Sequence, residues 1–553
     1  MRTKLFCIAL CLFMAGTMVF ATGSRQSAAS TGTPTLQIGI QRMVSVTDFV
    51  DNSMTRLVEK VNNVKLDFYY FPATNDEFIT RFSLLAASND LPETIVAGFI
   101  GGNEIAEFGA NGFLIALNRY MDDPSKTPVF NQLPRAHREA MISDLRFGDG
   151  NIYSFGTYQP YTWDQTVHRL FINRQWLSRL GLQAPTTTDQ LRNVLIAFRD
   201  RDPNGNGLRD EMGIVGVNYP SYGMNAMTSL INSFIYYDGL LALDSTGSNV
   251  ITPVTDPNFR KALQWLNGLY REGLIEPSTF TLDDAGYKAL LNADPAVVGF
   301  TSVAGAETFV DVRDNPNFLA MAPILPGPLT GPDGIGFSPY NKGGVYQRGF
   351  ITNKAKDVDL AVKVMDSNYR MDISLVGFMG EENVVWTRDP AKLAGLSNPY
   401  VVSGQVPAVT WAGLTTENVW YRPNAMWWGN VHLRYMPTEL QAAGGQLYPP
   451  LFDPNNYTIP PLEQVGIDTE KYYIPRHPQY ILPELRYSAA DTEAIAEATV
   501  NISSYVDRSI AEFITGARDI SNDTAWNAYL RELDNMGLQQ WVRIAQAQYN
   551  RQR

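Results

Sequence analysis

The sequence predicts an α/β protein built from more than one domain. Its 553 residues exceed the length of one ordinary domain and suggest two to four domains of about 100–200 residues each. Predicted strands and amphipathic helices alternate along the first hundred residues, a pattern typical of layered α/β domains. Hydrophobic residues make up 45% of the chain and charged residues 18%, which is enough apolar material for large cores and excludes a wholly disordered chain.

Five consecutive segments predict the first layered unit. Apolar residues recur at helical spacing in the second of its two helices, at Phe78, Phe82 and Leu85. The predicted strands are 35–40, 64–70 and 91–96, and the predicted helices between them are 46–61 and 75–89.

Further elements follow along the chain. The stretch from Pro185 to Asp189 is typical of a helix start, and Asp357 can cap another helix. The predicted strands are 151–155 and 168–173, and the predicted helices include 175–180, 259–272 and 354–369. A further helix is predicted after Asp189, with its apolar stripe at Leu191, Val194, Leu195 and Phe198. The C-terminal part, 488–553, is predicted to be mostly helical.

The N-terminus predicts export from the cytoplasm. Arg2 and Lys4 precede the apolar run 5–20, and small residues suit cleavage after Ala21. This pattern is typical of a secretory signal peptide (1–21), followed by a flexible linker (22–34). The alternative is a membrane anchor, which needs about 20 apolar residues, and this run is shorter.

The cysteine count refines this expectation. Cys7 and Cys11 are the only cysteines, and both lie inside the predicted signal peptide. The mature chain would then have no disulfide and no Cys-ligated metal. No cysteine stands at the cleavage site to carry a lipid, so we expect a soluble, unlipidated periplasmic or extracellular protein.

Several function classes are disfavoured. The net charge of −12 argues against a nucleic-acid partner, because an acidic chain repels phosphate backbones. The sequence contains no P-loop, no Gly-x-Ser-x-Gly elbow and no His-Glu-x-x-His pair, and its four histidines show no metal-ligand spacing. An Asp/Glu pair that hydrolyses a glycoside remains an open alternative, since the chain carries 56 carboxylates.

One motif predicts a calcium site. Calcium binds six to eight oxygen ligands, and the loop 202–211 offers oxygens at the spacing of an EF-hand loop. Gly207 allows the sharp turn, but Gly213 stands where an EF-hand has its last glutamate. The predicted ligands are Asp202, Asn204, Asn206, the Leu208 carbonyl, Asp210 and Glu211. The alternative is a connector of Asx-turns that needs no metal.

Aromatic residues make up 12% of the chain and are especially dense in two windows. Residues 156–165 contain Tyr158, Tyr161 and Trp163. Four of the ten tryptophans fall between 411 and 428: Trp411, Trp420, Trp427 and Trp428. Such rings can stack on the C–H faces of sugars, and the alternative is a hydrophobic loop packed on a core.

Taken in order, several blocks resemble a known family. The blocks are 84–96, 171–211, 263–277, 350–369 and 513–549, and they span most of the mature chain. They are similar to bacterial extracellular solute-binding proteins of ABC importers, family 1, in the large calcium-loop branch that includes alginate-binding and other oligosaccharide-binding proteins. Two departures from the family are the missing lipid-anchor cysteine and the absence of an expected Trp at Thr301 and Ser302.

The resemblance implies a fold. It is the two-lobe, type II periplasmic-binding-protein fold, α/β with discontinuous lobes that close on ligand and with a helical C-terminal region. We expect lobe 1 to comprise 35–155 and 316–346. Lobe 2 is expected to comprise 156–315 and 347–553, with the calcium loop and with C-terminal helices of which part can pack on lobe 1.

The resemblance also implies a function. It indicates a monomeric, non-catalytic component of an ABC transporter that captures an oligosaccharide between its lobes and delivers it to the transmembrane permease subunits, with Ca²⁺ in a structural role. By position and chemistry the expected ligand-binding residues are Tyr158, Tyr161, Trp163, Asn225, Tyr236, Tyr340, Trp411, Trp420, Trp427 and Trp428. The alternatives are a secreted polysaccharide-acting enzyme and a binding protein for a non-sugar solute such as a peptide.

Overall fold

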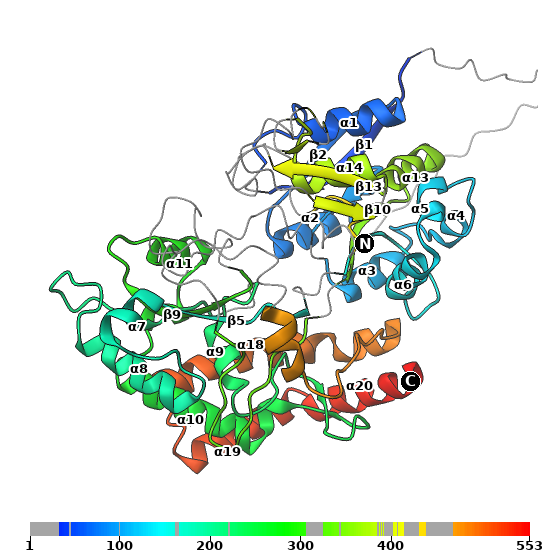
Figure 1. Ribbon diagram of the computed structural model, residues 1–553. Coiled ribbons are helices and arrows are strands. Elements are labelled where there is room, and N and C mark those ends of the chain that lie inside the picture. Colours follow the sequence, from blue (N-terminus) through cyan, green and yellow to red (C-terminus); the bar gives the residue numbers. More distant parts are fainter. Residues whose placement is uncertain are drawn as a thin grey trace, which may run out of the picture.

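The computed structural model of the chain consists of two lobes, seen one above the other in Figure 1. The structure describes residues 32–43, 46–98, 100–160, 165–218, 222–305, 325–341, 344–383, 386–387, 389, 391, 402–405, 408–413, 428, 431–437 and 468–553. The predicted signal peptide and most of the predicted linker lie outside these residues.

The first lobe is built on a five-stranded sheet with the strand order β2-β1-β3-β10-β4. Its strands are β1 (Thr35–Gln41), β2 (Lys65–Phe71), β3 (Thr94–Val96), β4 (Phe155–Gln159) and β10 (Gly344–Ile351). β1 is parallel to β2 and β3, whereas β10 is antiparallel to both β3 and β4. A distant segment of the chain therefore inserts between β3 and β4.

Helices cover both faces of this sheet (Figure 1). On one face, Leu36, Ile38 and Ile40 of β1 share a core with α1, α13, α14 and α6. On the other face, Phe71 and Ile95 pack against α2 and α3. The helices of this lobe are α1 (Ser53–Asn62), α2 (Asn75–Ala87), α3 (Gly102–Ala110), α4 (Asn118–Met121), α5 (Pro128–Gln132), α6 (Arg135–Leu145), α13 (Val358–Ser367) and α14 (Met371–Met379).

Local signals set the ends of these helices. The Asn52 side chain accepts a hydrogen bond from the N–H of Met54, so α1 begins later than the apolar periodicity alone predicts. Asn63, with φ 51°, ends it in the left-handed region. The Asp357 side chain accepts from the N–H of Leu360, which confirms it as the cap of α13.

The second lobe contains a three-stranded sheet in the order β5-β9-β6, and helices pack against this sheet to form a large apolar core. Its sheet strands are β5 (Arg169–Ile172), β6 (Met212–Ile214) and β9 (Val298–Val303), and its first helices are α7 (Arg174–Leu180), α8 (Thr188–Asp200), α9 (Ala226–Ile231), α10 (Pro257–Arg271) and α11 (Asp284–Leu291). Leu191, Val194, Leu195 and Phe198 are all buried, which confirms the predicted stripe of α8.

The C-terminal helices complete this lobe. They are α18 (Ala489–Thr515), α19 (Asp523–Asn535) and α20 (Leu538–Gln552). α18 packs along α10, and α20 packs against β8 (Val250–Ile251), which pairs with β7 (Ala242–Leu243). The beginning of α18 also contacts α3 of the first lobe. In the described part of the chain, each helix is too short or too polar to span a lipid bilayer.

The lobe boundaries differ from those expected. β4 belongs to the first sheet, so the first crossing follows residue 160 and not residue 155. β10, α13 and α14, expected in the second lobe, belong to the first because β10 pairs with β3 and β4. Conversely, Leu325 and Leu329, expected in the first lobe, lie in the core of the second.

Candidate functional site

A cavity of about 730 Å³ lies between the two lobes. The first lobe contributes Gly98, Ile100, Gly101 and Gly102, which follow β3, together with Asp144 of α6 and Val345–Arg348 of β10. The second lobe contributes Tyr236, Asp238, Leu241, Ala242, Tyr340 and the segment 481–484. In open α/β sheets ligands bind beyond the carboxyl ends of the parallel strands, and the end of β3 lies at this cavity.

Tyr236 and Tyr340 are the two expected ligand residues that the structure brings to this cavity. The Tyr236 hydroxyl donates to Asp238 Oδ2 at 3.3 Å and accepts from the N–H of Tyr340 at 3.5 Å. Burial raises the pKa of the Tyr236 hydroxyl, so this group remains a neutral donor. His477 contacts the Tyr340 ring edge-on at 5.2 Å, and burial lowers its pKa to about 4.

The sequence did not point to the charged residues of this cavity. Asp144, Asp238, Arg348 and Glu484 line it, and they come from four separate segments. Burial raises the pKa of the Asp238 carboxyl to about 7. Burial and the nearby Arg434 charge lower the pKa of the Arg348 guanidinium to about 9. Arg348 also donates to the Gly98 carbonyl oxygen, and its guanidinium lies 5.3 Å from the Tyr346 ring centre.

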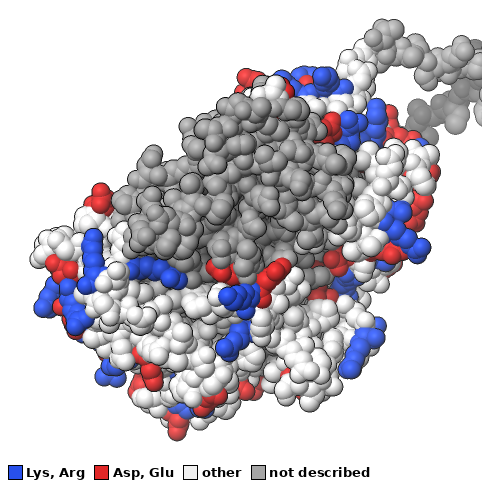
Figure 2. Space-filling model, in the orientation of Figure 1, with Lys and Arg blue, Asp and Glu red and all other residues white. Residues whose placement is uncertain are grey.

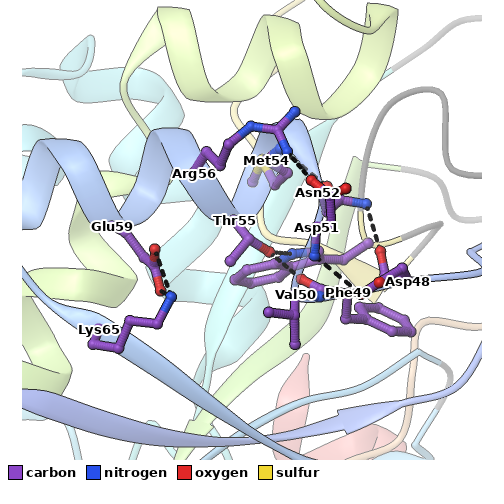
Figure 3. A network of polar contacts seen from close by, with 11 residues as sticks. Asp48, Phe49, Val50, Asp51, Asn52, Met54, Thr55, Arg56, Glu59 and Lys65 are labelled. Atoms are coloured by element: carbon purple, nitrogen blue, oxygen red, sulfur yellow. Dashed lines mark hydrogen bonds and ion pairs between the residues drawn. The ribbon is translucent and has the colours of Figure 1, made fainter.

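Trp428 was expected at the cleft surface, and the structure places it in the core of the first lobe. It is 1% exposed, and its indole N–H donates to Thr55 Oγ1 at 2.8 Å. The Thr55 hydroxyl in turn donates to the Phe49 carbonyl at 2.5 Å, within the network of polar contacts at the start of α1 (Figure 3). The indole also contacts Phe68 edge-on at 5.7 Å. A ring with this environment has no face available for a sugar.

Tyr158 is also buried. It is 7% exposed and stacks on His137 at 4.8 Å and on Tyr435 at 5.6 Å. Because its place in β4 turns it into the sheet core, its ring belongs to that core and not to the cavity surface.

The other expected ligand residues do not add to the described cavity. The Asn225 side chain accepts from the N–H of Thr228 and so caps α9. Trp411 lies on β13 (Ala408–Gly413), where its backbone pairs with Val402. Tyr161, Trp163, Trp420 and Trp427 lie outside the described residues.

The predicted calcium loop forms a tight network of its own. Asp202 accepts from the N–H groups of Gly205 and Asn206 through Oδ1 and from that of Gly207 through Oδ2. The Asn204 and Asn206 amides donate to the two Asp210 oxygens, each at 2.9 Å. These bonds are those of the Asx-turn connector, and they also bring the Asp202 and Asp210 carboxylates into one small loop.

Glu211 is the member of the loop that this network leaves unsatisfied. Among the residues that the structure describes, neither of its buried carboxylate oxygens meets a donor at good hydrogen-bonding geometry. Burial raises its pKa, partly offset by the N–H groups of Glu211 and Asn204, and the Asp210 and Asp202 charges raise it further. Within the described residues, no group of three or more His, Cys, Asp or Glu side chains is arranged as metal ligands. The loop therefore offers a buried carboxylate among like charges, but not a preassembled acidic cluster.

The described part of one face shows no continuous positive patch of the kind that would attract a polyanion. In Figure 2, positive and negative side chains are interspersed over the described part of this face, without a continuous positive patch. This agrees with the net charge of −12.

Comparison with known proteins relates the chain to sugar-transport components, although no family model matches it. The fructooligosaccharide ABC transporter substrate-binding protein FusA of Streptococcus pneumoniae is 25% identical over 523 residues, which cover 89% of this chain and 86% of FusA. The polygalacturonan/rhamnogalacturonan-binding protein YtcQ of Bacillus subtilis is 22% identical over 278 residues, which cover 50% of this chain and 51% of YtcQ.

Solved structures give the same picture of the fold. FusA in complex with kestose superposes with a TM-score of 0.74 at 22% identity, covering 94% of this chain and 99% of FusA. An EF-hand mutant of FusA in complex with fructo-nystose has a TM-score of 0.75 at 21% identity, with the same coverage. The alginate-binding protein AlgQ2 without calcium ion has a TM-score of 0.69 at 19% identity, again over 94% of this chain and 99% of that one. The chain is therefore a homologue of FusA with the two-lobe fold of ABC-transporter substrate-binding proteins.

Proposed function

We propose that this protein is the solute-binding component of an ABC transporter, which captures an oligosaccharide between its lobes and delivers it to a membrane permease. The observation that carries this is the inter-lobe cavity, in a chain related to FusA along nearly its whole length. FusA and YtcQ are named for binding, and neither comparison supports the alternative of a polysaccharide-acting enzyme.

The architecture suits capture by closure. Walls from both lobes meet at one cavity, so a sugar that contacts both walls stabilises the closed arrangement. The half-buried Tyr236 and Tyr340 rings supply apolar surface for sugar C–H faces. Such a complex would act as a monomer outside the cytoplasm, where the predicted signal peptide would send it, and the closed form would dock on the permease.

Calcium has a structural place in this proposal. Ca²⁺ held by Asp202, Asn204, Asn206, the Leu208 carbonyl, Asp210 and Glu211 would satisfy the buried Glu211 carboxylate and relieve the repulsion from its acidic neighbours. The loop follows α8 directly and leads into β6, so the ion would fasten this helix to the sheet.

The function is tested by binding measurements with a panel of neutral and acidic trisaccharides. Calorimetry on the wild-type protein should identify at least one ligand, and Tyr236→Ala should weaken that ligand's affinity by roughly 10- to 100-fold, from about 1–3 kcal/mol for the buried ring. Tyr270→Ala is the matched control, since this equally half-buried tyrosine of α10 lies outside the cavity lining. Failure to bind any sugar, or hydrolysis of the sugar during long incubation, would contradict the proposal.

A further inference from the structure

Asp238 has an unusual position at the cavity. It lies in the loop between α9 and β7, and its side chain opens to the cavity. The surrounding protein is nevertheless close enough that burial raises the pKa of its carboxyl to about 7. Within the described part of the chain, one hydrogen bond reaches this carboxylate, from the Tyr236 hydroxyl at 3.3 Å.

The carboxylate therefore has spare acceptor capacity. An ionised carboxylate offers about four lone-pair sites and no donor, and Tyr236 uses one of them. Tyr236 is itself held by the N–H of Tyr340, so Asp238 is oriented by a chain of two hydrogen bonds across the cavity wall. A ligand that brings hydroxyl donors can fill the remaining acceptor sites, and such charge-assisted bonds are stronger than neutral ones.

The other charges at the cavity favour an uncharged ligand. Asp144 and Glu484 line the same cavity, so the described lining residues include three carboxylates and one guanidinium, that of Arg348. Outside the lining, Arg486 lies 3.9 Å from Asp144 and pairs with it, which leaves Asp238 and Glu484 as the carboxylates that most disfavour an acidic ligand. Arg348 is already engaged with the Gly98 carbonyl and the Tyr346 ring. A carboxylate on a sugar would meet like charges in this cavity, whereas a hydroxyl would meet acceptors.

We propose that Asp238 accepts hydrogen bonds from neighbouring hydroxyl groups of an uncharged oligosaccharide, and that Asp238, Asp144 and Glu484 together discriminate against uronate-containing oligosaccharides. This inference rests on the proposed function and names its substrate class.

The arrangement makes binding depend on pH. Hydroxyl donors stabilise the ionised form of Asp238, so the sugar binds the deprotonated protein. The ionised fraction of Asp238 therefore falls as the pH drops from 8 to 6 through a pKa of about 7, and the apparent affinity for the sugar falls with it. Tyr236, which stays neutral, is the group that contacts Asp238. The other charged groups among the described residues that line the cavity are Arg348, Asp144 and Glu484, and His477, whose lowered pKa keeps it neutral, contacts the Tyr340 ring.

The folding stability of the sugar-free protein reports independently on the protonation of Asp238. Its folded pKa lies above its usual value of 3.8, so the folded protein binds the proton more tightly than the unfolded chain, and stability falls as pH rises from about 4 through about 7. Asp238→Asn removes this loss. The variant should therefore melt at a higher temperature than the wild type, with a larger difference at pH 8 than at pH 5, while it binds sugar less well.

The experiment uses calorimetry with kestose, maltotriose, cellotriose and xylotriose as neutral probes and trigalacturonate as the acidic probe. The wild type should bind a neutral probe and not trigalacturonate. Asp238→Asn should weaken the neutral probe at least tenfold at pH 8 and abolish the difference between pH 6 and pH 8. Asp90→Asn, at an exposed position of the first lobe, is the matched control and should change neither.

The outcomes separate the two proposals. Wild-type binding of trigalacturonate alone, or an Asp238→Asn variant with unchanged affinity for the neutral probe, would overturn this inference and leave the proposed function intact. Wild-type protein that binds no probe would contradict the proposed function itself.

Discussion

Replacing Trp428 tests whether this residue stabilises the first lobe or binds sugar. The structure places the indole in the core, 1% exposed, with its N–H bonded to Thr55 and its ring edge against Phe68. Because Phe lacks the indole N–H but keeps an apolar ring, Trp428→Phe removes the hydrogen bond and only part of the buried volume. Trp428→Ala removes the hydrogen bond, the ring contact with Phe68 and nearly all of the buried volume.

The expected magnitudes follow from these contacts. The buried hydrogen bond contributes about 0.5–1.5 kcal/mol, and the smaller Phe ring gives up about 1 kcal/mol of burial, so Trp428→Phe should cost about 1.5–2.5 kcal/mol. Trp428→Ala should cost about 3–5 kcal/mol, as expected for removing a fully buried aromatic side chain. A double-mutant cycle with Thr55→Val should assign about 0.5–1.5 kcal/mol to the Trp428–Thr55 bond itself.

Urea unfolding of the wild type and variants gives the free energies, and calorimetry gives their sugar affinity. Trp265→Phe is the matched control, because the buried Trp265 indole nitrogen has no hydrogen-bond acceptor in the described part of the chain and its loss breaks no bond there. Folded variants should bind sugar like the wild type. Unchanged unfolding midpoints together with lost sugar affinity would refute the core placement and put Trp428 on the cleft surface.

Two further predictions concern other parts of the fold. Tyr369→Phe should lower the free energy of unfolding by about 1–3 kcal/mol. The reason is that the buried Tyr369 hydroxyl donates to the Gly156 carbonyl at 2.9 Å and accepts from the Gly156 N–H at 3.1 Å. An unchanged urea midpoint would show that water replaces these bonds. Calcium should raise the melting temperature, since it binds the folded loop, and Asp202→Ala should abolish the rise whereas Asp90→Ala should not. A melting curve that responds to neither calcium nor chelator would leave the loop as an Asx-turn connector.

The sequence was sufficient to predict most local elements. Periodicity and caps depend on neighbouring residues, so segments such as 75–89 and 259–272 were found close to α2 and α10. Two boundaries differ from those predicted. The Asn52 cap delays the start of α1, and the strand predicted at 151–155 forms instead as β4, Phe155–Gln159.

Lobe membership and the cleft could not be predicted in this way. β10 joins the first sheet through pairing with strands far away in the sequence, and no local pattern records that pairing. Tyr158 and Trp428 illustrate the same limit, because aromatic clustering is equally compatible with a core and with a sugar platform. Asp238 was missed because a single acidic residue in a loop carries no sequence signal until the fold encloses it.

The position of β10 also determines when the first lobe can form during synthesis. Among the described strands, β10 connects β4 to the rest of the sheet, so a ribosome that has made the chain only as far as residue 343 has released β4 without its partner. The apolar face of β1 still lacks α13, α14 and Trp428 at that stage. A nascent chain of that length exposes an incomplete core and is prone to aggregation unless it is held by a chaperone. The same delay would keep the emerging polypeptide unfolded, which is the state that export by the predicted signal peptide would require.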